Sequence, residues 1–309
     1  MKTVFATLNC AAACIALLLM TACGSQNTKT QNPPKPHTVE IPKLPASLSK
    51  NDQQIYILDH YWEQFDASDT SWITDTAALE QLFAQWAFLL EQIPLQQATR
   101  YPAKLIQQAE KTPEMVLRLS ELAEHYFDNP NSPYRNQELF IPVLQAILQT
   151  KTLEDIYKQR PREQLASALK NRPGTQAADL TYMTSSGQKR NLYSCKAPYT
   201  LLIFYNPECT DCSRTKYYIE CSEVFSSLIA DNILKVIAIY PDKNLQAWQN
   251  DLPQMPKSWI VGRCYIGNDG KSPYNLPAIP SLYLLDQNKT VLLKDAPVER
   301  IEDYLYKQR

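Results

Sequence analysis

Apolar positions along the chain follow two different periods, and the change falls near residue 172. From residue 51 onward they recur every three or four positions, the spacing of one face of an amphipathic helix. After residue 172 they form short apolar or alternating runs, which is the pattern of strands. The sequence therefore predicts an all-α domain over residues 51–172, followed by an α/β domain over residues 173–309.

The pattern of the first domain predicts six helices. The second begins at Asp75, and the start of the fourth is marked by Thr112-Pro113-Glu114, because Thr suits the N-cap, Pro the first helical position and Glu the first turn. No glycine, which costs about 1 kcal/mol inside a helix, lies between residues 25 and 173. The expected helices are a first with the stripe Ile55, Leu58, Tyr61, Trp62 and Phe65, a second from Asp75, then Leu95–Glu110, a fourth from Thr112, Asn136–Leu148, and Thr152–Asn171, bent at Pro161.

Little chemistry is indicated in the helical domain. His60 and His125 stand apart from other metal-binding residues, so we expect structural or surface roles for both. The loop from Asn129 to Asn136 is rich in Pro and Asn, which favours turn chemistry, although Tyr134 and Arg135 in it would also suit a recognition point.

The pattern of the second domain predicts strands and helices that alternate along the chain. These are a hairpin of Leu180–Thr184 and Arg190–Ser194, a buried strand Thr200–Tyr205, a helix Ser213–Ala230, a strand Ile233–Tyr240, a helix Asn244–Asn250, a hairpin of Ser281–Asp286 and Thr290–Lys294, and a final helix Val298–Tyr306.

The N-terminus predicts an export signal and a lipid anchor. An apolar run from Val4 to Met20 leads into Thr-Ala-Cys23-Gly24, which resembles a bacterial lipoprotein lipobox whose Cys is lipidated. An ordinary signal peptide or an uncleaved anchor helix would be the alternatives. We interpret residues 1–22 as the signal peptide and residues 23–50, which contain five prolines, as a lipidated Pro-rich tether.

This organisation predicts a place in the cell envelope, lipid-anchored and facing the periplasm. The 31 basic and 32 acidic residues give a net charge of -1, which lacks the basic field that a nucleic-acid binder needs. We therefore expect a membrane anchor and no nucleic-acid partner.

Cys209 and Cys212 are the principal candidates for chemistry. They lie between the strand Thr200–Tyr205 and the following helix, so Cys209 would sit at a helix N-terminus that stabilises a thiolate. Cys212, one turn deeper, would attack a mixed disulfide formed on Cys209. Half of a zinc site is the alternative, but no second Cys-x-x-Cys and no later His follow, so we expect no metal.

Pro280 is the third candidate site residue. The order of strands and helices resembles that of a thioredoxin-like fold. In proteins of that fold an Ile-Pro or Thr-Pro just before the last hairpin carries a cis peptide facing the dithiol, so the resemblance implies a cis bond before Pro280. An ordinary strand-initiating Pro is the alternative.

These motifs resemble one family over about residues 50–309. PGTQAADLTYMTSSGQKRNLYS, YTLLIFYNPECTDC and AIPSLYLLDQNKTVLLKD are similar to extracytoplasmic thioredoxin-like reductases of the TlpA/ResA type. NSPYRNQELFIPVL resembles a helical domain of unknown function fused to such modules in Bacteroidota lipoproteins. The resemblance implies a membrane-tethered thiol–disulfide oxidoreductase that uses Cys209, Cys212 and Pro280.

The sequence also departs from that family around the dithiol. Glu208 replaces a frequent Trp, and Ile203 stands where many thioredoxins place a buried Asp. Glu220 and Glu223 would be substitutes for that acid, although solvated helix carboxylates are the simpler interpretation. Because the negative charges of Glu208 and Asp211 oppose a thiolate, we expect a reductant or isomerase rather than a strong oxidant.

Three further cysteines, Cys195, Cys221 and Cys264, are candidates for structural roles. Cys221 lies nine residues after Cys212, on the opposite helix face, so it would not join the dithiol. A structural disulfide among the three and buried free thiols are equally open.

Three functions remain as hypotheses. The first is reduction or exchange of disulfides in exported proteins, with a membrane or soluble thiol reductant as donor and no cofactor. The second is a non-catalytic binding or adaptor lipoprotein on a thioredoxin-like scaffold. The third, a thiol peroxidase, needs Thr or Ser where Asn206 precedes Cys209, so it is disfavoured.

Overall fold

The computed structural model describes most of the chain after the predicted leader and tether. The described residues are His37, Val39, Pro42, Leu44, Pro45, 48–267 and 272–308. The predicted signal peptide and the lipidation site Cys23 lie outside them. Within these ranges no helix has the length and apolar character needed to cross a membrane. Residues from His37 onward form one compact unit.

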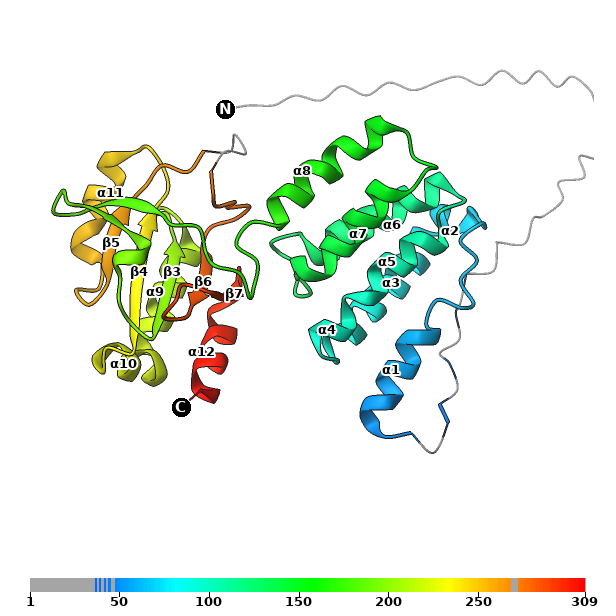
Figure 1. Ribbon diagram of the computed structural model, residues 1–309, viewed down its shortest axis with the longest axis horizontal. Coiled ribbons are helices and arrows are strands. Elements are labelled where there is room, and N and C mark those ends of the chain that lie inside the picture. The colour runs from blue at the N-terminus through cyan, green and yellow to red at the C-terminus, as the bar shows by residue number, and fades with distance from the viewer. Residues whose placement is uncertain are drawn as a thin grey trace, which may run out of the picture. The chain divides into compact units, whose positions relative to one another are not determined.

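The N-terminal part of this unit is all-helical, as expected (Figure 1). Its elements are α1 (Lys50–His60), α2 (Ser71–Thr74), α3 (Thr76–Glu91), α4 (Leu95–Ala98), α5 (Arg100–Gln108), α6 (Pro113–Phe127), α7 (Gln137–Gln149), the 3-10 turn η1 (Asp155–Lys158) and α8 (Gln159–Ala168).

Two of the predicted helices are broken, and proline explains both breaks. Pro102 has no N–H to bond the carbonyl of residue 98, so the expected helix Leu95–Glu110 is the pair α4 and α5. Pro161 likewise restricts the last helix to α8, after η1. The second helix was expected to begin at Asp75, which is the N-cap of α3 and accepts the N–H of Ala78. Thr112 occupies the predicted N-cap position of α6 but makes no side-chain bond there.

Aromatic side chains fill the core of the helical part. Trp62, Phe83, Trp86 and Phe127 are buried and contact one another at ring-centroid distances of 5.2–6.4 Å. Trp86 meets Trp62 and Phe83 edge to face, an arrangement that adds to their burial energy. The apolar stripes of the sequence therefore serve the packing of this core.

The C-terminal part is built on a seven-stranded mixed sheet in the order β2-β1-β5-β4-β3-β6-β7 (Figure 1). β3 pairs in parallel with β4, and β4 with β5, while the other pairs are antiparallel. The strands are β1 (Thr181–Thr184), β2 (Lys189–Asn191), β3 (Tyr199–Phe204), β4 (Leu234–Tyr240), β5 (Ile260–Arg263), β6 (Ser281–Leu285) and β7 (Val291–Lys294).

The helices of this part differ from prediction mainly between β3 and β4. The expected helix Ser213–Ala230 is two helices, because the Ser222 hydroxyl caps a new start by accepting the N–H of Phe225. The remaining elements are α9 (Thr210–Cys221), α10 (Glu223–Ala230), α11 (Leu245–Asp251), α12 (Val298–Lys307) and the 3-10 turns η2 (Leu192–Ser194) and η3 (Leu252–Gln254).

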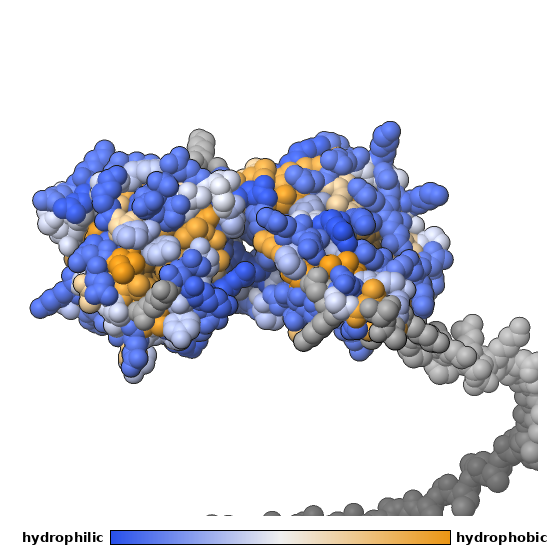
Figure 2. All heavy atoms as spheres, turned by 60° about the horizontal axis from the view of Figure 1, so that its bottom comes forward, coloured by the Kyte–Doolittle hydropathy of each residue, from blue (hydrophilic) through white to orange (hydrophobic). Residues whose placement is uncertain are grey.

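β3 is covered on both faces, which explains its unbroken apolar sequence. Leu201 and Ile203 pack in a cluster with residues of α9, α10, α11 and α12. Leu202 and Phe204 pack on the other side, in a cluster with Leu180 and Tyr274. On the face drawn in Figure 2, apolar side chains also reach the surface in several patches set among hydrophilic ones.

Candidate active site

Cys209 occupies the N-cap of α9, one residue before the helix begins. Its Sγ accepts a hydrogen bond from the backbone N–H of Cys212 at an N···S distance of 3.1 Å. An N-cap side chain normally satisfies such an unpaired helix N–H with an oxygen. Here sulfur takes that position, where the N–H groups and the helix dipole favour negative charge. The structure thus confirms the predicted position of Cys209.

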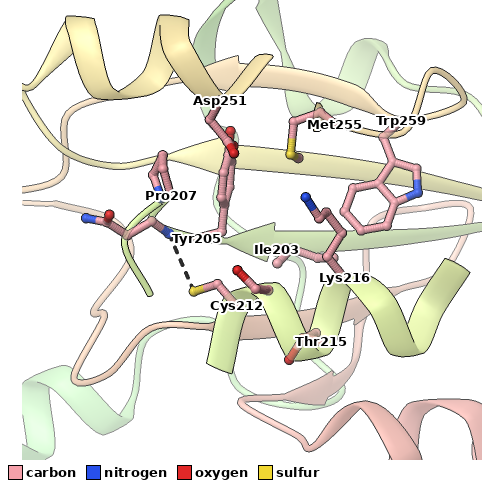
Figure 3. A pocket seen from close by; sticks show the side chains of 11 residues that line it. Ile203, Tyr205, Pro207, Cys212, Thr215, Lys216, Asp251, Met255 and Trp259 are labelled. Carbon is pink, nitrogen blue, oxygen red and sulfur yellow. Dashed lines mark hydrogen bonds between the residues drawn. The ribbon is translucent and has the colours of Figure 1, made fainter. Parts of the chain in front are cut away.

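Cys212 lies inside, in the first turn of α9. It is 7% exposed, and its Sγ accepts the backbone N–H of Asn206 at 3.5 Å (Figure 3). Burial, and secondarily its hydrogen bond with Cys209, raise the pKa of the Cys212 thiol. The two thiols therefore differ in environment: one is at a helix cap and partly exposed, and the other is desolvated.

Pro280 lies across from Cys209, in the segment that leads into β6. The Ile279–Pro280 peptide bond is cis, as predicted. The Ile279 carbonyl accepts the Cys209 thiol at 3.4 Å. The register of β3 and β6 explains this proximity, because Phe204 and Ser281 are paired at the end where both loops emerge.

A pocket opens beside Cys212 between α9 and the α11–η3 segment (Figure 3). Its empty volume, including the part open to solvent, is about 370 Å³. The enclosed part has room for about one water molecule. Its titratable side chains besides Cys212 are Tyr205, Lys216 and Asp251. Asp251 is the only carboxylate among the described residues that line it.

Tyr205 and Asp251 interact at the back of this pocket. Tyr205 is 6% exposed, and its hydroxyl has no well-formed hydrogen bond among the described residues. Burial, followed by the charge of Asp251, raises the pKa of Tyr205. Lys216 donates from Nζ to the Gln254 carbonyl at 3.1 Å. The pattern of the sequence carried no signal for these groups, because they come together only in three dimensions.

The acidic residues singled out by the sequence lie elsewhere. Glu220 and Glu223 are exposed and do not line the pocket, which agrees with the solvated interpretation. Asp211 is exposed and forms an ion pair with Arg214 at 2.8 Å, which partly offsets its charge near the thiols. Ile203 lines the same pocket as an apolar wall.

The five described cysteines are all free thiols. Cys221 is exposed at the end of α9, away from the dithiol as its spacing indicated. Cys195 is buried and Cys264 partly buried, and both belong to the cluster on the far side of the sheet. A disulfide among these three is therefore not found here, and burial raises the pKa of the Cys264 thiol.

The histidines show structural contacts. His60 Nδ1 lies 2.6 Å from a Glu63 carboxylate oxygen, and His125 packs against Tyr126. Across the described ranges, no group of three or more His, Cys, Asp or Glu side chains is arranged to hold a metal ion.

The sheet order and the capped Cys209–Cys212 pair define a thioredoxin-like protein. A crystal structure of a thioredoxin-like protein from Bacteroides caccae matches with 36% identity and a TM-score of 0.84, covering 88% of this chain and 99% of that one. The chain belongs to this family of thioredoxin-like proteins. Its residues 22–171 match the domain of unknown function DUF5106.

Two further solved structures match a smaller share of the chain. The C-terminal domain of an uncharacterized protein from Bacteroides fragilis is 42% identical, covering 44% of this chain and 99% of that one, with a TM-score of 0.42. A domain of a possible thiol-disulfide isomerase from Cytophaga hutchinsonii is 26% identical, covering 44% and 92%, with a TM-score of 0.39. No curated protein matches the chain. Membership of this thioredoxin-like family supports a redox-related role.

Proposed function

We propose that this protein is a thiol–disulfide oxidoreductase that reduces or exchanges disulfides of exported proteins. The proposal includes a lipid tether at Cys23 and a position facing the periplasm, both from the N-terminal sequence. The single observation that carries the activity is the Cys209 Sγ at the cap of α9, bonded by the Cys212 N–H. A thiolate there is stabilised by the helix N-terminus and remains accessible to a client disulfide.

The reaction begins with attack of the Cys209 thiolate on a client disulfide. One S–S bond forms between Cys209 and the client, and the client bond breaks to release one thiolate, which takes up a proton. Cys212 then attacks Sγ of Cys209 and releases the second client thiolate. Two electrons pass to the client, which leaves as a dithiol, and the protein is left with a Cys209–Cys212 disulfide.

The second step requires that Cys212 lose its proton. Burial raises the pKa of this thiol, so a base in the adjoining pocket would accelerate the step. Asp251 meets this requirement, because it lines the pocket with Cys212 and there is space for a bridging water. In this proposal Asp251 takes the role of the buried Asp that many thioredoxins have at the position of Ile203.

A thiol reductant closes the cycle. A dithiol donor in the envelope, membrane-bound or soluble, would reduce the Cys209–Cys212 disulfide by two successive exchanges and leave as a disulfide. No cofactor is needed, because the two electrons travel on sulfur throughout.

Insulin reduction in dithiothreitol tests the proposal. The wild-type protein is expected to accelerate precipitation of the insulin chains over a Cys209→Ser variant. A wild-type rate equal to that of the variant would contradict it.

Trapping identifies the clients. A Cys212→Ala variant keeps the nucleophile and lacks the resolving thiol, so mixed disulfides on Cys209 should accumulate in the envelope. Mass spectrometry of the adducts names the partners, and a variant lacking both thiols serves as the control. Adducts that persist in that control would contradict attack by Cys209.

A binding or adaptor function is a second candidate, favoured by an apolar groove on the helical part. The groove has a volume of about 880 Å³ and is lined by Ile57, Tyr61, Ala84, Gln85, Phe88, Leu89 and Tyr134. Phe88 is 50% exposed and adds apolar surface to this groove. Co-purification of a partner that survives loss of both Cys209 and Cys212 would support this function.

A further inference from the structure

Asp295 is a buried carboxylate whose two oxygens are bonded to different parts of the chain. It follows β7, and its side chain is 7% exposed. One oxygen accepts Arg135 at 3.0 Å, and the other accepts the hydroxyl of Ser281. Charge-assisted bonds on both oxygens hold a buried carboxylate in one orientation.

Arg135 brings the helical domain to this carboxylate. It lies in the loop between α6 and α7, with its side chain 14% exposed. Its Nε also donates to the Asp128 carbonyl at 3.3 Å, so the guanidinium is held from both sides. The loop from Asn129 to Asn136 therefore forms turns, as its Pro and Asn content predicted. The same loop carries Arg135, which contacts Asp295.

Ser281 connects the carboxylate to the dithiol. It is 3% exposed, begins β6 and directly follows Pro280. Two residues before it, the Ile279 carbonyl accepts the thiol of Cys209 at 3.4 Å. A continuous path of bonded groups therefore runs from Arg135 through Asp295 and Ser281 to the carbonyl beside the nucleophile.

The neighbouring lysine anchors the same segment separately. Lys294 donates from Nζ to the carbonyls of Ala168 and Lys170, at 3.1 and 2.6 Å. Removing Arg135 therefore leaves the connection to α8 in place.

We propose that Arg135 is a positioning residue for the dithiol, which through Asp295 and Ser281 fixes the Ile279 carbonyl against Cys209. The helical domain thereby sets how readily the dithiol is oxidised. This proposal deepens the proposed thiol–disulfide function and rests on it.

The chemical consequence concerns the reduced form. The Ile279 carbonyl accepts a hydrogen bond from the Cys209 thiol, whereas a Cys209–Cys212 disulfide has no S–H to offer. A well-placed carbonyl therefore stabilises the dithiol. If the carbonyl is free to move, the balance shifts toward the disulfide.

Equilibration with glutathione measures this balance without any client. One oxidised glutathione converts the dithiol to the disulfide and leaves as two reduced molecules, a two-electron exchange. The fraction of Cys209–Cys212 disulfide is read by acid quenching, alkylation and mass spectrometry. Arg135→Met is expected to raise the equilibrium constant toward the disulfide about twofold to fivefold, the weight of one weak hydrogen bond.

Four further variants give the controls. Ser281→Ala should shift the constant in the same direction, and the double variant should shift it no further than the larger single change. Arg135→Lys keeps a charge opposite Asp295 and should restore the wild-type value. Arg162→Met removes an exposed arginine of the same domain that pairs with Asp155, and should change nothing.

The outcomes separate the two proposals. Wild-type values for Arg135→Met and Ser281→Ala, or shifts that simply add, would overturn the positioning role. So would a change in thermal stability with an unchanged equilibrium constant. A shifted constant in a protein that does not reduce insulin would keep the positioning role and refute the proposed function. A wild-type protein that forms no Cys209–Cys212 disulfide would refute both.

Discussion

The backbone N–H of Cys212 is bonded to Sγ of Cys209 at 3.1 Å, so one contact both caps α9 and links the thiol of Cys209 to the backbone of Cys212. Stability and reactivity of the helix start therefore depend on the same atom. This makes it possible to separate the two effects by substitution.

Cys209→Ser should keep the cap and remove the redox chemistry, because a serine hydroxyl accepts the same N–H. Cys209→Ala should remove both and lower the free energy of unfolding by about 1 kcal/mol relative to Cys209→Ser. Urea denaturation of the reduced proteins measures the difference. Equal stabilities of the two variants would show that the capping bond contributes nothing.

Asp251→Asn should slow release of a mixed disulfide on the order of a hundredfold, because the base for Cys212 is lost. The first attack by Cys209 should be unaffected, since Asp251 takes no part in it. Single-turnover kinetics with a disulfide-bonded peptide resolves both steps. Glu220→Gln, which changes an exposed carboxylate on α9, is the matched control and should keep the wild-type rate.

The stability of the reduced protein should fall at alkaline pH through Cys212. Burial raises the pKa of this thiol, so the folded protein retains a proton that the unfolded chain releases above about pH 8.5. Because the folded state then binds more protons, the free energy of unfolding decreases as the pH rises, on the order of 1 kcal/mol per unit.

Urea unfolding of wild type and Cys212→Ala between about pH 7.5 and 9.5 checks this. The variant should show the shallower decline. Cys221→Ala removes an exposed thiol and should follow the wild type. Parallel curves for wild type and Cys212→Ala would contradict the assignment.

Gly262→Ala should destabilise the sheet by about 1–3 kcal/mol, because a Cβ on β5 would lie 2.5 Å from Cδ2 of Tyr182 on β1. The cost should be smaller in a Tyr182→Leu background, where the ring is absent. A double-mutant cycle of unfolding free energies gives the coupling. An unchanged cost in both backgrounds would place the strain elsewhere.

The strand β5 is an element that the sequence pattern did not predict. Ile260–Arg263 is short, contains Gly262 and carries no alternation, so the pattern predicted no strand there. The tertiary structure inserts it between β1 and β4, where backbone pairing rather than its own side chains defines it. By contrast, the apolar run of β3 identified a buried strand because both of its faces are covered.

By itself the sequence determined the features that depend on neighbours along the chain. The helical and strand periods, the helix start at Asp75 and the position of Cys209 before α9 are of this kind, because helix starts and amphipathicity depend on a few neighbouring residues. Only the tertiary structure decided which distant groups serve the dithiol. It placed Asp251 in the pocket of Cys212 and Arg135 against Asp295, 160 residues away, because side chains so far apart meet only when the packing of the fold brings them together.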